Sequence, residues 1–212
     1  FQLGAIAKVH KNLRLGASYE SPTWYRISEE TTQSIATTRD DAGTLVTDVI
    51  APNVINIFPS FRLQTPAKIN GSAAILFGKK GLISFDYTLK DYANLKFRPT
   101  NDANFASQNN LISNTLKSTS SYRIGGEYRI DELSLRGGYR FEESPYEDGT
   151  TFSDLTGFSV GLGYNFGKIR IDATYDQSEQ TRNFQLFNQG LTDSNRVDGK
   201  NSNVTVSVNF TL

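Results

Sequence analysis

The sequence predicts an all-β fold, a transmembrane antiparallel up-and-down β-barrel, from three observations. Apolar and polar residues alternate in one segment after another, as they do in "SNVTVSVNFTL" at residues 202–212. The connections between these segments are alternately short and long. The aromatic residues of the apolar phase gather near the segment ends. Because successive side chains of a strand point to opposite faces, each segment is predicted to be a strand with one apolar face.

Nine strands are predicted, and none of the segments between them shows a helical period. In the last strand Val204, Val206 and Val208 alternate with polar residues, and the pattern continues to Leu212. The third strand keeps a single apolar phase over its whole length, from position 57 to position 77. The predicted strands lie at about residues 1–10, 13–25, 57–77, 83–90, 122–130, 133–141, 158–166, 169–176 and 202–212.

The connections indicate which end of each strand lies on which side of the membrane. The short ones are Lys11-Asn12, 78–81, Asp131-Glu132 and Gly167-Lys168, made of residues that tight hairpins prefer. The long ones, rich in Asn, Asp, Ser and Thr, cover residues 26–53, 98–117, 143–155 and 185–200. Alternation of short turns and long loops is typical of bacterial outer-membrane barrels, in which the short turns are periplasmic.

The aromatic residues support this topology independently. With the short turns in the periplasm, one set lies near the outer strand ends and a second set near the inner ends. The outer set is Tyr19, Phe85, Tyr87, Tyr122, Tyr139, Phe141, Phe158 and Tyr175, and the inner set is Phe77, Tyr128, Tyr164, Phe166 and Phe210. Two aromatic girdles at the two bilayer interfaces are expected of a surface that faces lipid.

Composition excludes several other classes of protein. The 212 residues include no cysteine, and the formal net charge is +0. Disulfides and cysteine metal sites are therefore excluded, and no nucleic-acid partner is indicated. The only histidine, His10, is predicted to lie in the polar phase beside a turn. We therefore expect no catalytic residue, no cofactor and no metal site, and hence no enzyme.

An even strand number with both termini in the periplasm is the usual form of such barrels. The nine predicted strands end in the periplasm, so the first of them begins outside. We therefore expect residues 1–212 to be the C-terminal portion of a single barrel domain that lacks an odd number of N-terminal strands.

Three stretches resemble the FadL family of outer-membrane transporters for hydrophobic compounds. They are "LRLGASYES" (13–21), "LQTPAKINGSAAILFGKKGLISFDYTLKDYANLKF" (63–97) and "LRGGYRFEESPYEDG" with "FSDLTGFSVGLGYNFG" (135–167). The resemblance lies in a Leu-Pro element, Gly-aromatic strands and a Ser-Pro loop, in the family's order. It implies a fourteen-stranded barrel whose N-terminal hatch and about five strands precede these nine.

The resemblance also implies a function and a place in the cell. We expect passive uptake of long-chain fatty acids or other hydrophobic compounds across the outer membrane of a Gram-negative bacterium. The expected partners are membrane lipid, a hydrophobic ligand and, in one version, other outer-membrane chains. Two alternatives stay open: a FadL-like barrel that assists protein secretion, as in the type IX system, and a general diffusion porin.

Charged side chains are predicted in the barrel lumen, where Arg123, Arg136 and Arg140 lie in the polar phase. One interpretation is an ion-pair network that fills the lumen and braces the wall. The other is that some of these arginines bind the carboxylate of a fatty acid, since guanidinium groups suit carboxylates.

Apolar residues near the outer loops are the remaining candidates. Trp24 and Tyr25 close the second strand, and Phe187 and Leu191 lie in the last long loop. Exposed apolar clusters mark either a contact site or local packing of the loop. Pro59 and Pro66 interrupt the third strand, because proline cannot donate a backbone hydrogen bond. They indicate either a bulge or a local weakness through which ligand leaves the wall.

Overall fold

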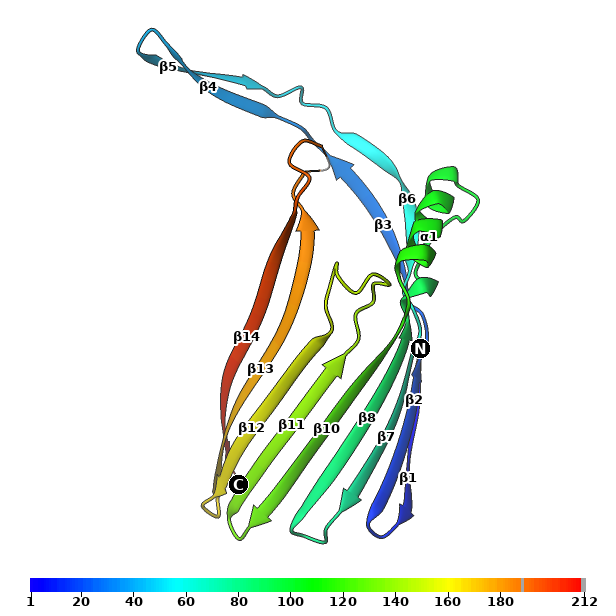
Figure 1. The fold of residues 1–212 in the computed structure, drawn as a ribbon, viewed down its shortest axis with the longest axis vertical. Helices are drawn as coiled ribbons and strands as arrows, with labels where there is room; N and C mark the ends of the chain where they lie inside the picture. Colours follow the sequence, from blue (N-terminus) through cyan, green and yellow to red (C-terminus); the bar gives the residue numbers. More distant parts are fainter. Residues whose placement is uncertain (188, 211–212) are drawn as a thin grey trace.

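The computed structural model describes residues 1–187 and 189–210 and consists mostly of one large antiparallel sheet. Its nine strands follow the order β1-β2-β7-β8-β10-β11-β12-β13-β14. The chain therefore passes from each strand of the sheet to its neighbour, in an up-and-down topology. The sheet curves into an open trough (Figure 1). The strands are β1 (Gln2–His10), β2 (Leu13–Glu20), β7 (Lys68–Leu76), β8 (Gly81–Asp91), β10 (Ser118–Ile130), β11 (Leu133–Glu142), β12 (Leu155–Asn165), β13 (Ile169–Gln185) and β14 (Ser194–Phe210).

The nine predicted strands are therefore confirmed as the strands of this sheet, but two of them have wrong bounds: predicted strand 13–25 ends in this sheet at Glu20, and predicted strand 57–77 begins in it at Lys68. The four predicted short turns join β1 to β2, β7 to β8, β10 to β11 and β12 to β13. In the last of these turns Gly167 has φ +92°, a conformation that L side chains rarely adopt. Leu212, which the alternation assigns to the apolar face, lies outside the described residues.

The apolar face of the sheet is uncovered. Within the described residues no hydrophobic side chain is buried, and Leu162 and Val204 are 57% and 74% exposed. β11 and β12 have 10 and 11 residues, close to the roughly 9–11 that a tilted strand needs to cross a bilayer. A continuous apolar face of this height is far larger than the patches that soluble proteins leave in water, so it is a lipid-facing surface.

The outer aromatic girdle is a chain of ring contacts. The ring centroids of Tyr87 and Tyr122 lie 5.3 Å apart, and those of Tyr122 and Phe141 lie 6.2 Å apart. Phe158 and Tyr175 continue the belt at 6.0 Å. These rings come from adjacent strands at one level, as the sequence predicts for a bilayer interface.

Beyond this girdle the chain forms a second body of structure on the side of the long loops. A three-stranded sheet has the order β3-β6-β9, and a two-stranded ribbon pairs β4 with β5. A single α-helix lies beside β6 and β9 (Figure 1). These elements are β3 (Trp24–Thr31), β4 (Ile35–Asp41), β5 (Thr44–Ile50), β6 (Asn56–Gln64), the 3₁₀ turn η1 (Tyr92–Asn94), β9 (Lys96–Arg98) and α1 (Ala103–Thr115).

Several loop predictions are wrong here. Residues 26–53 hold most of β3 and the β4–β5 ribbon, and β14 begins at Ser194 within the predicted loop 185–200. β13 and β14 are 17 residues long and extend past the girdle. The N–H and C=O groups of neighbouring strands can hydrogen-bond to each other in water as well as in lipid. A polar sequence therefore does not exclude strands.

The prediction that no helix forms is also wrong. The side chain of Asp102 caps α1 by accepting hydrogen bonds from the backbone N–H groups of Asn104 and Phe105. Phe105, Asn109 and Ile112 are half-buried on one face of α1, at helical spacing. Neither α1 nor η1 is long or apolar enough to cross a membrane.

The long third strand that the sequence predicts is divided at residues 65–67. In β2–β7 Glu20 lies opposite Lys68, and in β3–β6 Trp24 lies opposite Gln64, so the same register continues through the break. Pro22 and Pro66 fall opposite each other in this continued register. Since neither proline can donate a backbone hydrogen bond, the ladder is interrupted at this level. Pro59 lies at a register shift between β3 and β6, which confirms the bulge interpretation for that residue.

The two faces of the sheet should differ sharply in their tolerance of charge. We expect Leu162→Arg or Val206→Arg to impair membrane insertion, because a mid-bilayer arginine on the lipid face costs roughly 2–4 kcal/mol. Ser159→Arg, on the polar face of the same strand as Leu162, should be far milder. Folding yield in liposomes, followed by the heat-dependent shift in gel mobility, measures both. Equal losses at the two kinds of position would contradict the assignment of faces.

Candidate functional site

The polar face of the large sheet carries charged side chains in rows that the strand register defines. Arg136 on β11 lies opposite Glu127 on β10 and opposite Gly161 on β12. Two rows further up, Arg140 lies opposite Arg123 and Gly157. This face forms the inside of the trough and is the candidate lumen surface.

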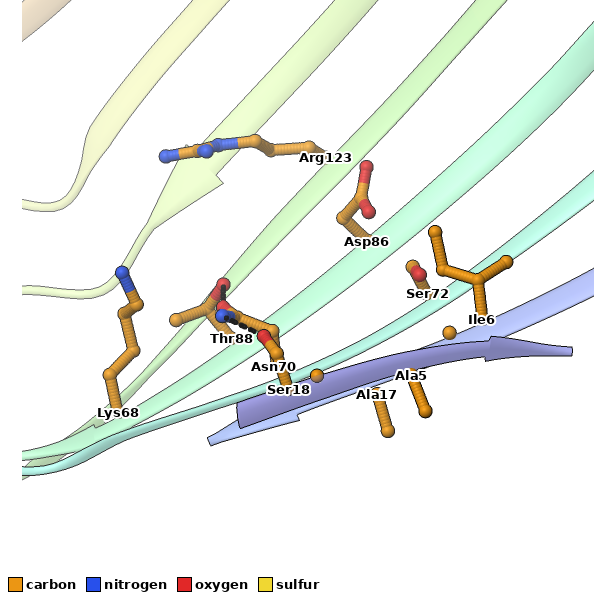
Figure 2. Close-up of a pocket in the computed structure, with 12 residues that line it drawn as sticks. Ala5, Ile6, Ala17, Ser18, Lys68, Asn70, Ser72, Asp86, Thr88 and Arg123 are labelled. Atoms are coloured by element: carbon orange, nitrogen blue, oxygen red, sulfur yellow. Dashed lines mark hydrogen bonds between the residues drawn. The ribbon is translucent and has the colours of Figure 1, made fainter. Parts of the chain in front are cut away.

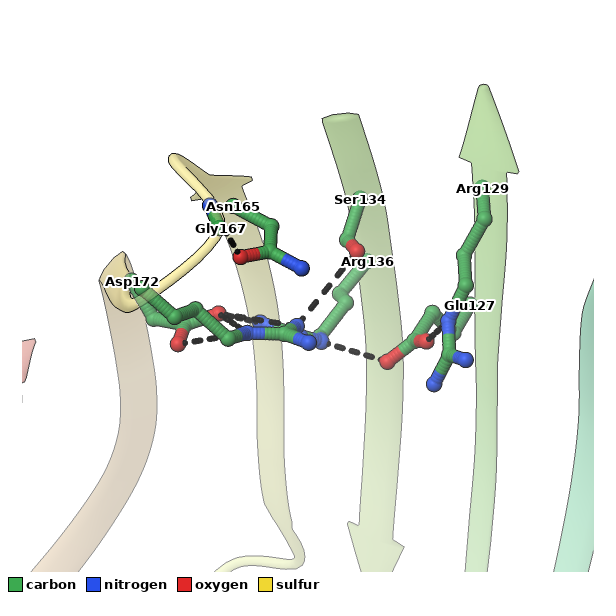
Figure 3. A network of polar contacts seen from close by, with 8 residues as sticks. Glu127, Arg129, Ser134, Arg136, Asn165, Gly167 and Asp172 are labelled. Atoms are coloured by element: carbon green, nitrogen blue, oxygen red, sulfur yellow. Dashed lines mark hydrogen bonds and ion pairs between the residues drawn. The ribbon is translucent and has the colours of Figure 1, made fainter. Parts of the chain in front are cut away.

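A network of five charges crosses this surface near the short turns (Figure 3). The guanidinium of Arg136 donates to Glu127 Oε2 and to Asp172 Oδ1, both at 2.7 Å. Arg129 also pairs with Glu127, and Arg170 Nε lies 3.0 Å from Asp172 Oδ2. Arg136 thus joins β10 to β13 across three strand spacings, which braces the wall.

Glycines of β12 make room for these long side chains. A Cβ on Gly161 would lie 3.1 Å from Thr174 Oγ1 of β13, and one on Gly157 would lie 2.8 Å from Arg140 Nε. A Cβ on Gly163 would collide with the carboxylate of Asp172. The side chains of β11 and β13 therefore lie flat over β12. The alternation of glycine in "GFSVGLG" (157–163) is a requirement of this packing.

The three lumenal arginines that the sequence singles out have different surroundings. Arg136 belongs to the network, as the ion-pair interpretation predicts. Arg123 pairs with Glu142 at 3.0 Å, and its side chain is 59% exposed. Arg140 is half-buried over Gly157, and within the described residues it forms no ion pair. A ligand contact of Arg123 or Arg140 stays a prediction.

A hollow lies on the same face near β1 and β2 (Figure 2). Asn70 donates to Ser18 Oγ at 3.0 Å and accepts from Thr88 Oγ1 at 2.6 Å, so three strands are linked by side chains. Ile6 points to the same side and is 82% exposed. The predicted alternation does not include this apolar side chain in the polar phase, although Ile6 between Ala5 and Ala7 is the one break in the alternation of β1.

The second body of structure places Trp24 and Tyr25 on opposite faces of β3. Trp24 donates from Nε1 to Gln64 Oε1 at 3.3 Å. Tyr25 lies opposite Leu63, which in turn lies opposite Phe97.

On that second face an aromatic cluster packs α1 against the sheet. Phe105 of α1 has its ring centroid 5.4 Å from that of Phe61 and 5.7 Å from that of Phe97. The Asn109 side chain exchanges two hydrogen bonds with the backbone of Phe97, at 2.8 and 3.0 Å. Loop packing is therefore the role of Phe105.

Phe187 and Leu191 lie between β13 and β14 and are 56% and 77% exposed. β3 continues β2, which is second in the sheet, whereas β13 and β14 are last. The structure therefore does not bring Phe187 and Leu191 together with Trp24 and Tyr25. The two pairs belong to separate parts of the barrel mouth.

A tight turn in the loop between β11 and β12 is held by the carboxylate of Asp148. Asp148 accepts hydrogen bonds from the hydroxyl and the backbone N–H of Thr151 and from the backbone N–H of Thr150. These bonds favour the charged form and lower the pKa of Asp148 to about 2.

Comparison with known proteins gives a family and a fold. The sequence profile of the family described as outer membrane protein transport protein (OMPP1/FadL/TodX) matches residues 1–211. No curated protein sequence matches significantly.

Two solved structures share the fold. One is the Pseudomonas putida toluene transporter TodX, with 15% identity and TM-score 0.51, matched over 98% of this chain and 48% of that one. The other is OmpT, a Vibrio cholerae outer membrane protein in a trimer form, with 16% identity and TM-score 0.52, over 99% and 55%. The chain spans about half the length of these proteins.

The two interpretations of the lumenal arginines lead to different mutant stabilities. Arg136→Gln should lower stability by roughly 1–3 kcal/mol, because two half-buried carboxylates each lose a partner. Arg140→Gln should change it far less, since no ion pair is lost. Thermal unfolding in detergent measures both variants. A larger loss for Arg140→Gln than for Arg136→Gln would contradict the bracing role of the network.

Proposed function

Because this chain belongs to the OMPP1/FadL/TodX family of outer membrane transport proteins, we propose that it forms the wall of a passive transporter for hydrophobic compounds. The compounds are long-chain fatty acids or other small apolar molecules. The observation that carries the proposal is the family match, which extends over residues 1–211. The two-faced sheet supports it, because one face suits lipid and the other lines a lumen.

The proposed path begins at the barrel mouth. A hydrophobic molecule must leave water before it can enter the wall, and exposed apolar side chains lower the free energy of that step. Trp24, Phe187 and Leu191 are exposed apolar groups beyond the outer girdle. These residues are proposed as the first contacts of the hydrophobic molecule. The ion-paired lumen face below them is proposed as the wall along which the molecule then passes.

The ion pairs that cross the lumen face favour this function over general diffusion. The experiment reconstitutes the complete protein in liposomes and measures uptake of labelled dodecanoate and labelled toluene. We expect saturable uptake of at least one of them and no steady ion current in planar bilayers. An open-pore current without saturable uptake would support the porin alternative and contradict the proposal.

The tip between β13 and β14 can be tested separately. Replacement of Phe187 and Leu191 by Ser removes two exposed apolar contacts. If they capture ligand, the apparent affinity for dodecanoate should fall by roughly thirtyfold or more, since two buried apolar side chains that each contribute about 1 kcal/mol or more together contribute about 2 kcal/mol or more. Ile35→Ser on the β4–β5 ribbon, also exposed, is the matched control. Unchanged uptake with an intact barrel would leave these two residues without a role in capture.

A further inference from the structure

Three arginines lie side by side in the three-stranded outer sheet. Arg26 on β3 is the direct partner of Arg62 on β6, and Arg62 is the direct partner of Arg98 on β9. Like charges directly opposite each other in a sheet are destabilising. A row of three arginines therefore needs either a group of opposite charge that offsets the repulsion or a function that explains why the row is present.

In the part of the chain that the structure describes, no carboxylate supplies that compensation. Among the described residues, the ion pairs of the molecule involve none of these three guanidinium groups. Their hydrogen bonds go instead to neutral side chains. Arg26 Nη2 donates to Ser60 Oγ at 3.2 Å, and Arg98 donates to Gln64 Oε1 from Nη2 at 2.8 Å and from Nε at 3.0 Å. All three arginines are exposed at a hollow of the surface.

The row lies on the face that continues the lumen lining. Since one register runs from β2–β7 into β3–β6, even-numbered residues stay on one face, from Glu20 and Lys68 in the barrel to Arg26 and Arg62 outside it. The opposite face is the one that α1 and its aromatic cluster cover. The three guanidinium groups therefore look toward the barrel mouth, away from the membrane lipid.

An aromatic ring and a fourth cation lie next to the row on its barrel side. Trp24, Gln64 and Lys96 form the adjacent row on the same face. Gln64 Oε1 accepts from both Trp24 and Arg98, so it holds the indole and a guanidinium in fixed positions across the sheet. From outside inward, the surface presents three guanidinium groups and then an exposed indole.

We propose that Arg26, Arg62 and Arg98 form an oxyanion-binding site that takes the carboxylate of a hydrophobic acid, with the apolar part of that acid lying over Trp24 toward the lumen. Guanidinium groups bind carboxylates through paired hydrogen bonds, and the ligand's charge relieves the repulsion within the row. The proposal rests on the proposed function, since it assigns the first step of uptake to this site. It names the substrate class as acids and orients the ligand with its charged head outward.

The experiment compares an acid with a neutral molecule of the same chain length. The complete protein is embedded in liposomes of phosphatidylcholine, and octanoate or octan-1-ol is added. Binding is followed by the fluorescence of Trp24, the only tryptophan among the 212 residues, with any tryptophan outside them replaced by phenylalanine. The variant is Arg26→Gln with Arg62→Gln. The control is Arg39→Gln with Arg196→Gln, which removes the same net charge from other exposed positions outside the row.

We expect the Arg26/Arg62 variant to bind octanoate roughly three- to tenfold more weakly, as the loss of two exposed charge pairs implies. Its affinity for octan-1-ol should not change. High salt should reduce the octanoate affinity of the unmodified protein toward that of the variant. The control variant should bind both molecules as the unmodified protein does. Thermal stability of the Arg26/Arg62 variant should be equal or higher, since repulsion is removed.

Three results would overturn the site: unchanged octanoate affinity in the Arg26/Arg62 variant, equal weakening for both molecules, or equal weakening in the control. Uptake measured in parallel separates the site from the transport function. Binding at the row without uptake of octanoate or dodecanoate would uphold the site and refute the transport proposal. Uptake of octanoate together with unchanged octanoate affinity in the Arg26/Arg62 variant would do the reverse.

Discussion

The antiparallel backbone ladder is the constraint on which the rest of this structure depends. No water is available in the hydrocarbon core to replace a missing backbone hydrogen bond, so strands that cross it must be paired without interruption. Apart from a register shift between Lys8 and His10 beside the first short turn, the ladder is continuous from β1 to β14 below the outer girdle. Because a pleated strand alternates its side chains, this pairing separates an apolar face from a charged face. The glycines of β12 follow from the same geometry, since they seat the arginines of β11.

The prolines mark where that constraint ends. Pro22 and Pro66 are opposite each other just beyond the last paired residues of β2 and β7, at the level where the chain enters water. Above them the strands pair in smaller groups, a helix packs on one side, and the β4–β5 ribbon stands alone. Water can satisfy backbone groups that are left unpaired in this region, so irregular structure is tolerated there.

Two sets of arginines illustrate two uses of the same side chain. Arg136 lies between two carboxylates and contributes to the rigidity of the wall. The arginines of the Arg26–Arg62–Arg98 row form no ion pair with a carboxylate of the described residues, and their side chains are exposed to solvent. Repulsion within the row is a local cost to stability that an anionic ligand would offset. On this one face, the arginine inside the barrel is thus paired with carboxylates, whereas the arginines at the barrel mouth lie next to one another.

The sequence by itself determined the nine membrane strands, their faces and their short turns, because alternation is a local pattern that does not depend on the partner strand. It also identified the lumenal arginines, since their phase follows from that alternation. Only the tertiary structure decided the division of residues 57–77, the helix α1 and the row through Arg62. These features depend on the register between segments far apart in the chain, such as Trp24 with Gln64. Local periodicity carries no information on that register, because any even shift preserves the same pattern of faces.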